Sequence, residues 1–333
     1  MLEPLGPTKI PFYTGNLSVH PIMVYWGTAT GEAHDYVDEE RIELIKRVSC
    51  IGDVDYQAWC LAEKQPGQWD FSLYIRNADK LHEAGLKYIC FCWVHFPPKW
   101  YLDSPEYVPY KNIVTGHTIK QISPWSPAIW DVYERFYRAQ AEAMGDKIDW
   151  IRIATPADYG EIGYPAGLTS WLVPEKHAGP GYWCGDKYAL ADFQNEMQRR
   201  FVLIETLNQR WGTAFGNWSE VTFPELKDEQ AARTARQTGK PTDRRRWLDF
   251  LDWHMEFWER FVPRLTNLIR AFHKDKPLIV SVGYASERAH CGNDYSSLPR
   301  MAAEAGVAMQ TPGNVPYYAQ KRISSACRHW GVP

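Results

Sequence analysis

The sequence lacks the long apolar runs of membrane proteins and any strong excess of charge of one sign. No stretch of about 18 apolar residues occurs, so no membrane partner is expected. The formal net charge is −3, and nucleic acid is not an expected partner because phosphate binding needs clustered positive charge. The amino-terminal residues lack a charged start, an apolar stretch and a small-residue cleavage site, so a cytoplasmic location is expected.

Cysteine is sparse and follows neither a disulfide nor a metal-binding pattern. The seven cysteines are an odd number and are scattered singly, except for Cys90 and Cys92, so no disulfide framework is expected. Neither C-x-x-C nor H-E-x-x-H spacing occurs, and we therefore expect no metal and no cofactor. Cys90 and Cys92 alternate within an apolar run, which predicts buried thiols on one face of a strand.

Aromatic residues are abundant, with 16 Trp and 19 Tyr, and hydrophobic residues make up 45% of the chain. Short apolar runs alternate with longer amphipathic ones, which is the pattern of βα units around a parallel sheet. The predicted strands are 22–26, 54–60, 86–93, 150–154, 278–282 and 307–311. The predicted helices are 38–48, 72–84, 127–144, 190–211, 247–272 and 299–305.

This alternation predicts an α/β fold, a (β/α)8-type TIM barrel in one domain that spans 1–333, with a long insertion at about 163–246 after the fourth strand. Gly85, Gly306 and Gly331 each separate a predicted helix from an apolar residue that opens a strand. The third junction lies just before the last residue, so about six βα units and an incomplete barrel are expected. An open sheet edge leaves backbone groups unpaired, and a homo-oligomer that covers this edge is expected.

The active site of such a barrel lies at the carboxyl ends of its strands. Behind the fourth strand, Glu161 stands among aromatic and apolar residues, a setting that raises a carboxyl pKa as a general acid requires. Glu161 is therefore the candidate catalytic residue, and the alternative is an ion pair with a basic residue of the loop. Asp158 and Tyr159 of the same loop are candidate substrate contacts, and the alternative for Asp158 is a turn-stabilising role.

Aromatic residues follow three consecutive predicted strands at comparable places. Trp26, Trp59 and Trp93 are candidate substrate contacts because indole faces stack on sugar rings. A large aromatic side chain also fills the space between a barrel and its helices, so a packing role stays open for each of them. His95 is a candidate hydrogen-bond partner of a substrate hydroxyl, with a buried structural histidine as the alternative.

Two segments resemble a known family. Residues 65–71 (QPGQWDF), followed by a helix and by 84–88 (AGLKY), resemble the second and third units of clan-A glycoside hydrolases, especially the family 42 β-galactosidases. Residues 207–215 (LNQRWGTAF) are similar to the same family's Leu-Asn-x-x-Trp-Gly-Thr-x-Phe motif. The matches run from about residue 20 to 330. The resemblance implies a TIM-barrel O-glycosyl hydrolase whose partner is an oligo- or polysaccharide.

The resemblance also implies retaining hydrolysis of a β-glycoside by two carboxylates, with the acid/base after strand four and the nucleophile after strand seven. Glu161 is similar in position to the acid/base. It follows Gly160 where the clan usually has Asn, and a Gly-Glu pair resembles the β-amylases, which are inverting. No residue inherits the nucleophile's role. Glu287 and Glu32 are the candidates for a second carboxylate, and Tyr284 and Glu287 are also candidate substrate contacts.

The leading functional hypothesis is a β-galactosidase- or β-glucosidase-like hydrolase of β-linked saccharides, weakly active or inactive without the strand-seven nucleophile. An alternative from another class is a non-catalytic carbohydrate-binding or scaffold protein, derived from such a barrel and completed by oligomerisation. A third hypothesis is a metal-dependent barrel enzyme such as a sugar isomerase, for which the sequence offers no convincing ligand cluster.

Overall fold

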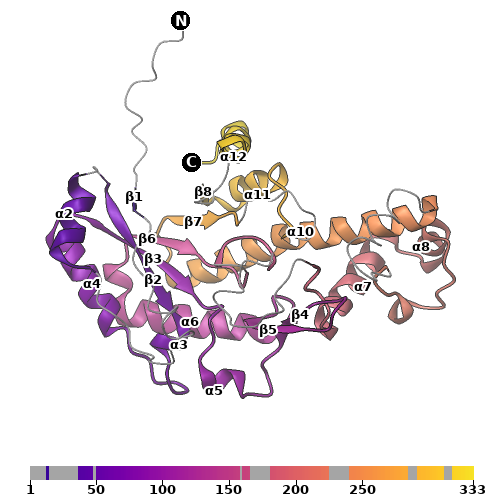
Figure 1. Cartoon of the computed structure of the whole chain (residues 1–333), viewed down its shortest axis with the longest axis horizontal. Helices are drawn as coiled ribbons and strands as arrows, with labels where there is room; N and C mark the ends of the chain where they lie inside the picture. Colours follow the sequence, from indigo (N-terminus) through magenta and orange to yellow (C-terminus); the bar gives the residue numbers. More distant parts are fainter. Residues whose placement is uncertain are drawn as a thin grey trace, which may run out of the picture.

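The computed structural model describes residues 13–14, 37–47, 50–157, 160–165, 181–224, 240–283, 291–310 and 317–333. These residues form a parallel sheet flanked by helices (Figure 1). The strand order is β1 (Tyr13–Thr14), β2 (Gly52–Ala58), β3 (Lys87–Trp93), β6 (Trp150–Ile153), β7 (Leu278–Ser281) and β8 (Ala308–Gln310). A separate antiparallel pair consists of β4 (Pro109–Lys111) and β5 (Thr118–Ile122).

The described helices follow the predicted alternation closely. They are α2 (Glu39–Arg47), α3 (Trp59–Ala62), α4 (Ser72–Glu83), α5 (Lys99–Leu102), α6 (Ala128–Met144), α7 (Lys187–Phe201), α8 (Ile204–Trp211), α10 (Pro241–Phe272), α11 (Ser297–Ala305) and α12 (Tyr317–Trp330), with short 3-10 turns at Gly145–Lys147 and Trp218–Glu220. In the part of the chain that the structure describes, no helix combines the length and the apolar character that crossing a membrane requires.

Three element predictions differ from the structure. The predicted helix 190–211 is two helices, because Val202 adopts a left-handed φ of 61° and interrupts the hydrogen-bond ladder after α7. The predicted strand 54–60 ends at Ala58, and its last two residues begin α3. The predicted strand 22–26 lies outside the described residues, and β1, which pairs with β2, was not predicted.

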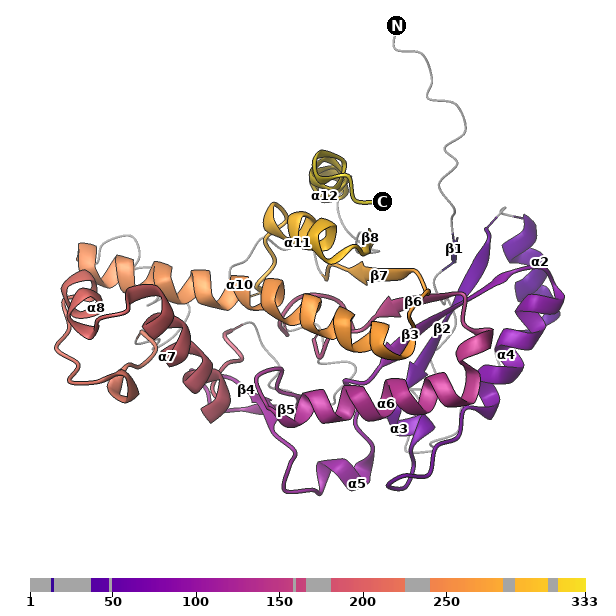
Figure 2. The same cartoon turned by 180° about the vertical axis from the view of Figure 1, so that it is seen from behind.

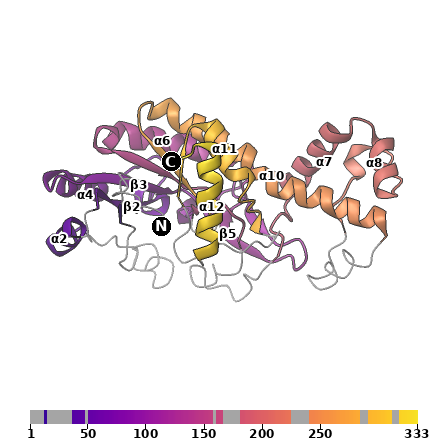
Figure 3. The same cartoon turned by 90° about the horizontal axis from the view of Figure 1, so that it is seen from above.

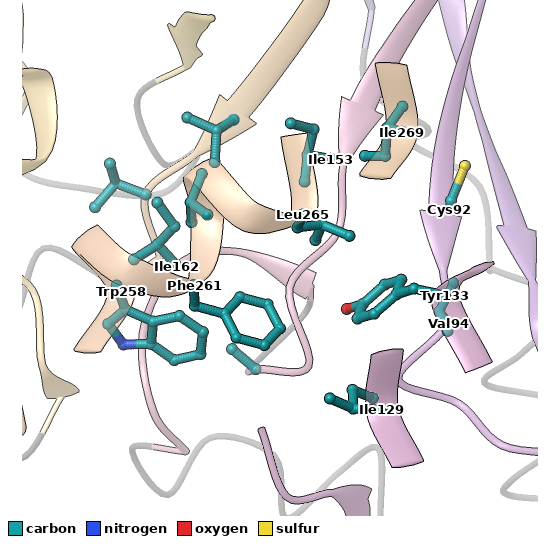
Figure 4. Packing of buried hydrophobic residues seen from close by; sticks show 14 of the residues in the cluster. Cys92, Val94, Ile129, Tyr133, Ile153, Ile162, Trp258, Phe261, Leu265 and Ile269 are labelled. Atoms are coloured by element: carbon teal, nitrogen blue, oxygen red, sulfur yellow. The ribbon is translucent and has the colours of Figure 1, made fainter. Parts of the chain in front are cut away.

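The two faces of the sheet are both buried, but against different partners. One face carries the larger core cluster, in which side chains of the sheet pack on α6 and α10. Figure 4 shows Cys92 and Ile153 of the sheet facing Tyr133 of α6 and Leu265 of α10. From behind, these two helices run side by side across the sheet (Figure 2). The other face carries a smaller, separate cluster that forms the barrel interior, with Phe91 at its centre.

The prediction for the cysteine pair is confirmed. Cys90 and Cys92 are both free thiols with no exposed surface. They lie on the helix-facing side of β3, with their Sγ atoms 3.7 Å apart. The Gln140 amide of α6 donates a hydrogen bond to the Cys92 sulfur at 3.1 Å. The pair is therefore part of the packing between the sheet and α6.

The three predicted helix-to-strand junctions share one geometry. Gly85, Gly306 and Gly331 have left-handed φ values of 74°, 63° and 68°. In each case the amide of the next residue donates to the carbonyl five residues earlier, at 2.8 to 3.0 Å, which is the Schellman arrangement. After the third junction, the Pro333 carbonyl accepts a hydrogen bond from the Met309 amide of β8 at 3.0 Å. The backbone of Pro333 therefore lies against the edge of β8.

A helical arm extends from one end of the sheet. It consists of α7, α8 and the amino-terminal half of α10, and it projects to the right in Figures 1 and 3. The motif at 207–215 lies in this arm, where Asn208 Oδ1 accepts hydrogen bonds from the Phe215 amide and the Thr213 hydroxyl. The Trp211 indole donates to Asp249 of α10 at 2.7 Å. The motif is therefore closed on itself by Asn208 and is joined to α10 by Trp211.

The pH dependence of stability should depend on His273, which is buried at the end of α10. Burial, with a smaller effect of Lys276, lowers its pKa to about 4 from the ordinary 6.5. Between these values the unfolded chain binds a proton that the folded chain does not, so the free energy of unfolding falls as the pH falls through this window. Lowering the pH from 7 to 5 should cost about 2 kcal/mol through this residue.

Urea unfolding at the two pH values measures this effect. A His273→Leu variant, similar in volume, should lose about 2 kcal/mol of the difference between pH 7 and pH 5. The matched variant His329→Leu replaces an exposed histidine and should retain the wild-type difference. An unaltered difference in His273→Leu would mean that other groups cause the pH dependence.

Candidate functional site

Glu161 lies at the carboxyl ends of two neighbouring strands. After β6 the chain makes a tight turn, closed by a hydrogen bond from the Thr155 amide to the Gly160 carbonyl at 2.8 Å. It then returns to β7, where the Ile162 amide donates to the Ser281 carbonyl at 2.7 Å. Ile162 also forms a parallel bridge with Val282. Glu161 is therefore placed by backbone hydrogen bonds rather than by a free loop.

The residue before Glu161 must be glycine for two reasons. Gly160 has a left-handed φ of 74°, which side-chain-bearing residues rarely adopt. A Cβ at this position would lie 2.9 Å from His95 Cε1, 3.0 Å from Phe91 Cζ and 3.1 Å from Ala154 Cβ. The turn is pressed against the barrel interior, so the Asn that the clan usually has here does not fit without a shift of these neighbours.

The carboxylate of Glu161 is held at one oxygen. Arg152 donates from Nη2 to Glu161 Oε1 at 2.6 Å, and the two side chains are 6% and 16% exposed. In the described part of the chain, no hydrogen bond reaches the other oxygen, Oε2. An ion pair of Glu161 was the alternative to a catalytic role, and such a pair exists, although with a strand residue rather than with a loop residue.

Burial dominates the electrostatics of this carboxyl. It raises the pKa of Glu161 above its usual range, while the charge and the hydrogen bond of Arg152 act in the opposite direction without cancelling the rise. Burial likewise raises the pKa of Tyr56 of β2, with Arg152 opposing and Glu161 adding to the rise. The pKa of Tyr295 is raised by burial, by Cys291 and, to a smaller extent, by Glu161. Two phenols therefore lie within electrostatic reach of Glu161.

Two of the predicted contact residues lie beside this turn. Trp93 ends β3 on the interior side and is 4% exposed. His95 follows it with no exposed surface, its ring centroid 5.3 Å from that of Trp93 and 4.5 Å from that of Phe96. The close approach of His95 to Gly160 brings this ring next to the backbone that carries Glu161.

Trp59 has the packing role that was the alternative to a substrate contact. Trp59 begins α3 instead of ending a strand, and it belongs to the core cluster between the sheet and the helices. It is 1% exposed, and its indole N–H already donates to Glu63 at 2.6 Å. The other predicted residues, namely Trp26, Asp158, Tyr159, Tyr284 and Glu287, lie outside the described residues, as does Glu32.

Arg152 is a site residue that was not predicted from the sequence. The signal was present, because Arg152 is a charged residue in the otherwise apolar strand run 150–154. Its position alternates with Ile151 and Ile153, so it faces the barrel interior rather than the helices. No group of three or more His, Cys, Asp or Glu side chains within the described ranges is arranged to hold a metal ion.

Comparison with known proteins bears on both the fold and the family. The model of glycoside hydrolase family 42, described as β-galactosidase, matches residues 33–301. A thermophilic β-amylase of Thermoanaerobacterium thermosulfurigenes is 27% identical over 175 residues, which are 47% of this chain and 31% of that protein. A β-galactosidase of Arthrobacter sp is 27% identical over 219 residues, or 64% of this chain and 28% of that protein. The chain therefore spans less than half the length of these relatives.

Solved structures show the same fold at low identity. The catalytic domain of β-amylase from Paenibacillus polymyxa has a TM-score of 0.72 and 16% identity, covering 97% of this chain and 84% of that one. The β-galactosidase of Marinomonas ef1 has a TM-score of 0.63 and 17% identity, covering 91% and 40%. These likenesses confirm the predicted α/β class with the TIM-barrel type of parallel sheet.

Proposed function

The chain belongs to glycoside hydrolase family 42, the β-galactosidase family, and from this membership we propose that it hydrolyses a β-linked saccharide with Glu161 as the general acid. The observation that supports this role is the asymmetry of the Glu161 carboxyl. Oε1 accepts a hydrogen bond from Arg152, whereas Oε2 has no partner within the described residues. A proton on Oε2 is available to a bound substrate.

The chemistry follows from that proton. Burial raises the pKa of Glu161, which favours the protonated acid. The acid donates its proton to the glycosidic oxygen as the bond to the anomeric carbon breaks, and a second carboxylate then acts either as nucleophile or as base for a water. Glu287, which follows β7, is the candidate to test first for that second role, and Glu32 is the next. Substrate contacts are proposed for Trp26, Trp93, His95, Asp158, Tyr159 and Tyr284.

A second candidate function is a β-amylase-type activity on starch. Gly160 favours it, because the tight contacts of this glycine leave no room for the Asn that precedes the acid/base in the β-galactosidase pattern. Two curated relatives and one solved structure carry the name β-amylase. The two candidates differ in substrate and in whether the configuration at the anomeric carbon is retained or inverted.

In the described sheet, β1 and β8 are the edge strands. We propose that a homo-oligomer covers the β8 edge beyond the Met309 amide, which donates to the Pro333 carbonyl. We also propose that the chain forms a single barrel-type domain with an insertion at about 163–246. Sedimentation of the purified chain as a stable monomer would count against this assembly.

The experiment that tests the function is a substrate panel. Nitrophenyl β-galactoside, nitrophenyl β-glucoside and soluble starch are incubated with the purified chain, and product anomers are followed by NMR. We expect turnover of a β-glycoside with retained configuration and a rate that falls as the pH rises through the pKa of the acid. Turnover of starch alone supports the second candidate. Saccharide binding without turnover of any substrate supports the non-catalytic alternative.

A further inference from the structure

We propose that Arg152 is a positioning residue that holds Glu161 by one oxygen and thereby determines which oxygen carries the catalytic proton. The inference deepens the proposed function and rests on the role of Glu161 in it. Its basis is a hydrogen-bonded cluster inside the barrel, formed by side chains of three neighbouring strands and the turn that follows β6. The cluster consists of Arg152, Glu161, Ser281 and Gln310.

The guanidinium of Arg152 is fixed on two sides. The Arg152 residue is 5% exposed, and its Nε donates to the Ser281 hydroxyl at 2.7 Å while Nη2 donates to Glu161. The Ser281 hydroxyl donates in turn to Gln310 Oε1 at 3.1 Å. The guanidinium carbon Cζ lies over the Phe91 ring, 3.9 Å from the ring centroid. A planar fork with bonds in two directions and a ring beneath it has little freedom to rotate.

Among the described groups around Glu161, Arg152 is the one with a permanent charge. From the neighbouring elements these groups are Tyr56 of β2, His95 after β3 and Tyr295 before α11. None of these three carries a permanent positive charge, whereas an arginine stays protonated. Arg152 is therefore the group whose removal should change the titration of Glu161 most.

The geometry assigns different roles to the two oxygens of Glu161. Oε1 accepts a hydrogen bond from Arg152, and this bond is stronger when Oε1 is the carbonyl oxygen of the protonated acid than when it carries the proton itself. The acid proton is therefore held on Oε2. Once Oε2 has passed this proton to a leaving group, the new carboxylate keeps its charge-assisted hydrogen bond with Arg152. Arg152 thus directs the acid proton and stabilises the carboxylate that remains.

Direct titration of Glu161 tests this inference without any substrate. The chain is labelled with 13C at the glutamate carboxyls, and the Glu161 signal is identified by its loss in Glu161→Gln. An arginine beside a carboxyl lowers its pKa by about 1–3 units, so Arg152→Met should raise the pKa of Glu161 by that order. Arg152→Lys, which keeps the charge, should restore most of the wild-type titration. The control Arg210→Met removes the ion pair with Asp249 in the arm and should leave the Glu161 signal unchanged.

A second variant keeps the inference falsifiable if Arg152→Met does not fold. Ser281→Ala retains both charges and removes the hydrogen bond at Arg152 Nε, so it should produce an upward shift smaller than that of Arg152→Met. A wild-type titration of Glu161 in a folded Arg152→Met or in Ser281→Ala overturns the inference. Shifted titrations in a chain that hydrolyses nothing would leave the positioning role intact and overturn the proposed function instead. In an active chain, Arg152→Met should lower kcat more than it changes KM and should move the alkaline limb of the pH profile upward.

Discussion

Replacing Glu161 by glutamine should lower kcat for glycosides with poor leaving groups by about 10²–10⁴-fold, the usual contribution of a general acid. Glutamine preserves the size of the side chain, and its carbonyl oxygen can still accept the hydrogen bond of Arg152. The amide, however, has no acidic proton to give to the glycosidic oxygen. The loss should therefore fall on the chemical step rather than on binding.

The dependence on the leaving group distinguishes this role from a structural one. A dinitrophenyl group leaves with little protonation, so the loss in Glu161→Gln should be much smaller with dinitrophenyl than with methyl glycosides. The control is Glu63→Gln, because Glu63 has no exposed surface and holds Trp59, the Gly67 amide and Arg135. This variant should lower stability and leave the leaving-group dependence unaltered. Equal losses with both leaving groups in Glu161→Gln would assign Glu161 to binding or structure.

Replacing Gly160 by alanine should destabilise the fold by about 2–5 kcal/mol, the sum of a backbone cost and a packing cost. The φ of 74° is costly for a residue with a side chain, and the new Cβ would lie 2.9 to 3.1 Å from His95, Phe91 and Ala154. These three residues are buried, the turn packs on them, and they have little room to move. Relief of the clash should displace the turn and Glu161 with it, so activity should fall together with stability.

Gly67→Ala is the matched control for this variant. Gly67 has the same φ of 74°, but a Cβ there would have nothing within 4 Å. Its replacement should therefore cost only the backbone part, about 1–2 kcal/mol. Urea unfolding of both variants measures the difference, which isolates the packing contribution at Gly160. Equal losses would show that Gly160 is required for its backbone conformation alone.

Features that depend only on residues close together along the chain could be predicted from the sequence. The helices were predicted because apolar side chains recur at helical spacing, and the junctions at Gly85, Gly306 and Gly331 because a left-handed residue after a helix is a local requirement. Cys90 and Cys92 were placed on one buried face by the two-residue period of a strand. The placement of Glu161 at the end of β6 followed from its distance along the chain from a strong strand signal.

The face of each strand that forms the barrel interior was decided only by the tertiary structure. Both faces of a strand in a parallel sheet are buried, so the residue pattern does not distinguish the interior from the helix-covered side. Cys92 of β3 accordingly packs on the helix side, and Arg152 of β6 points inward to Glu161. The partner that orients Arg152 is Ser281, 129 residues away. The sequence by itself determined the order of the elements and one candidate carboxylate, whereas the cluster around that carboxylate exists only because parallel pairing brings β6, β7 and β8 together.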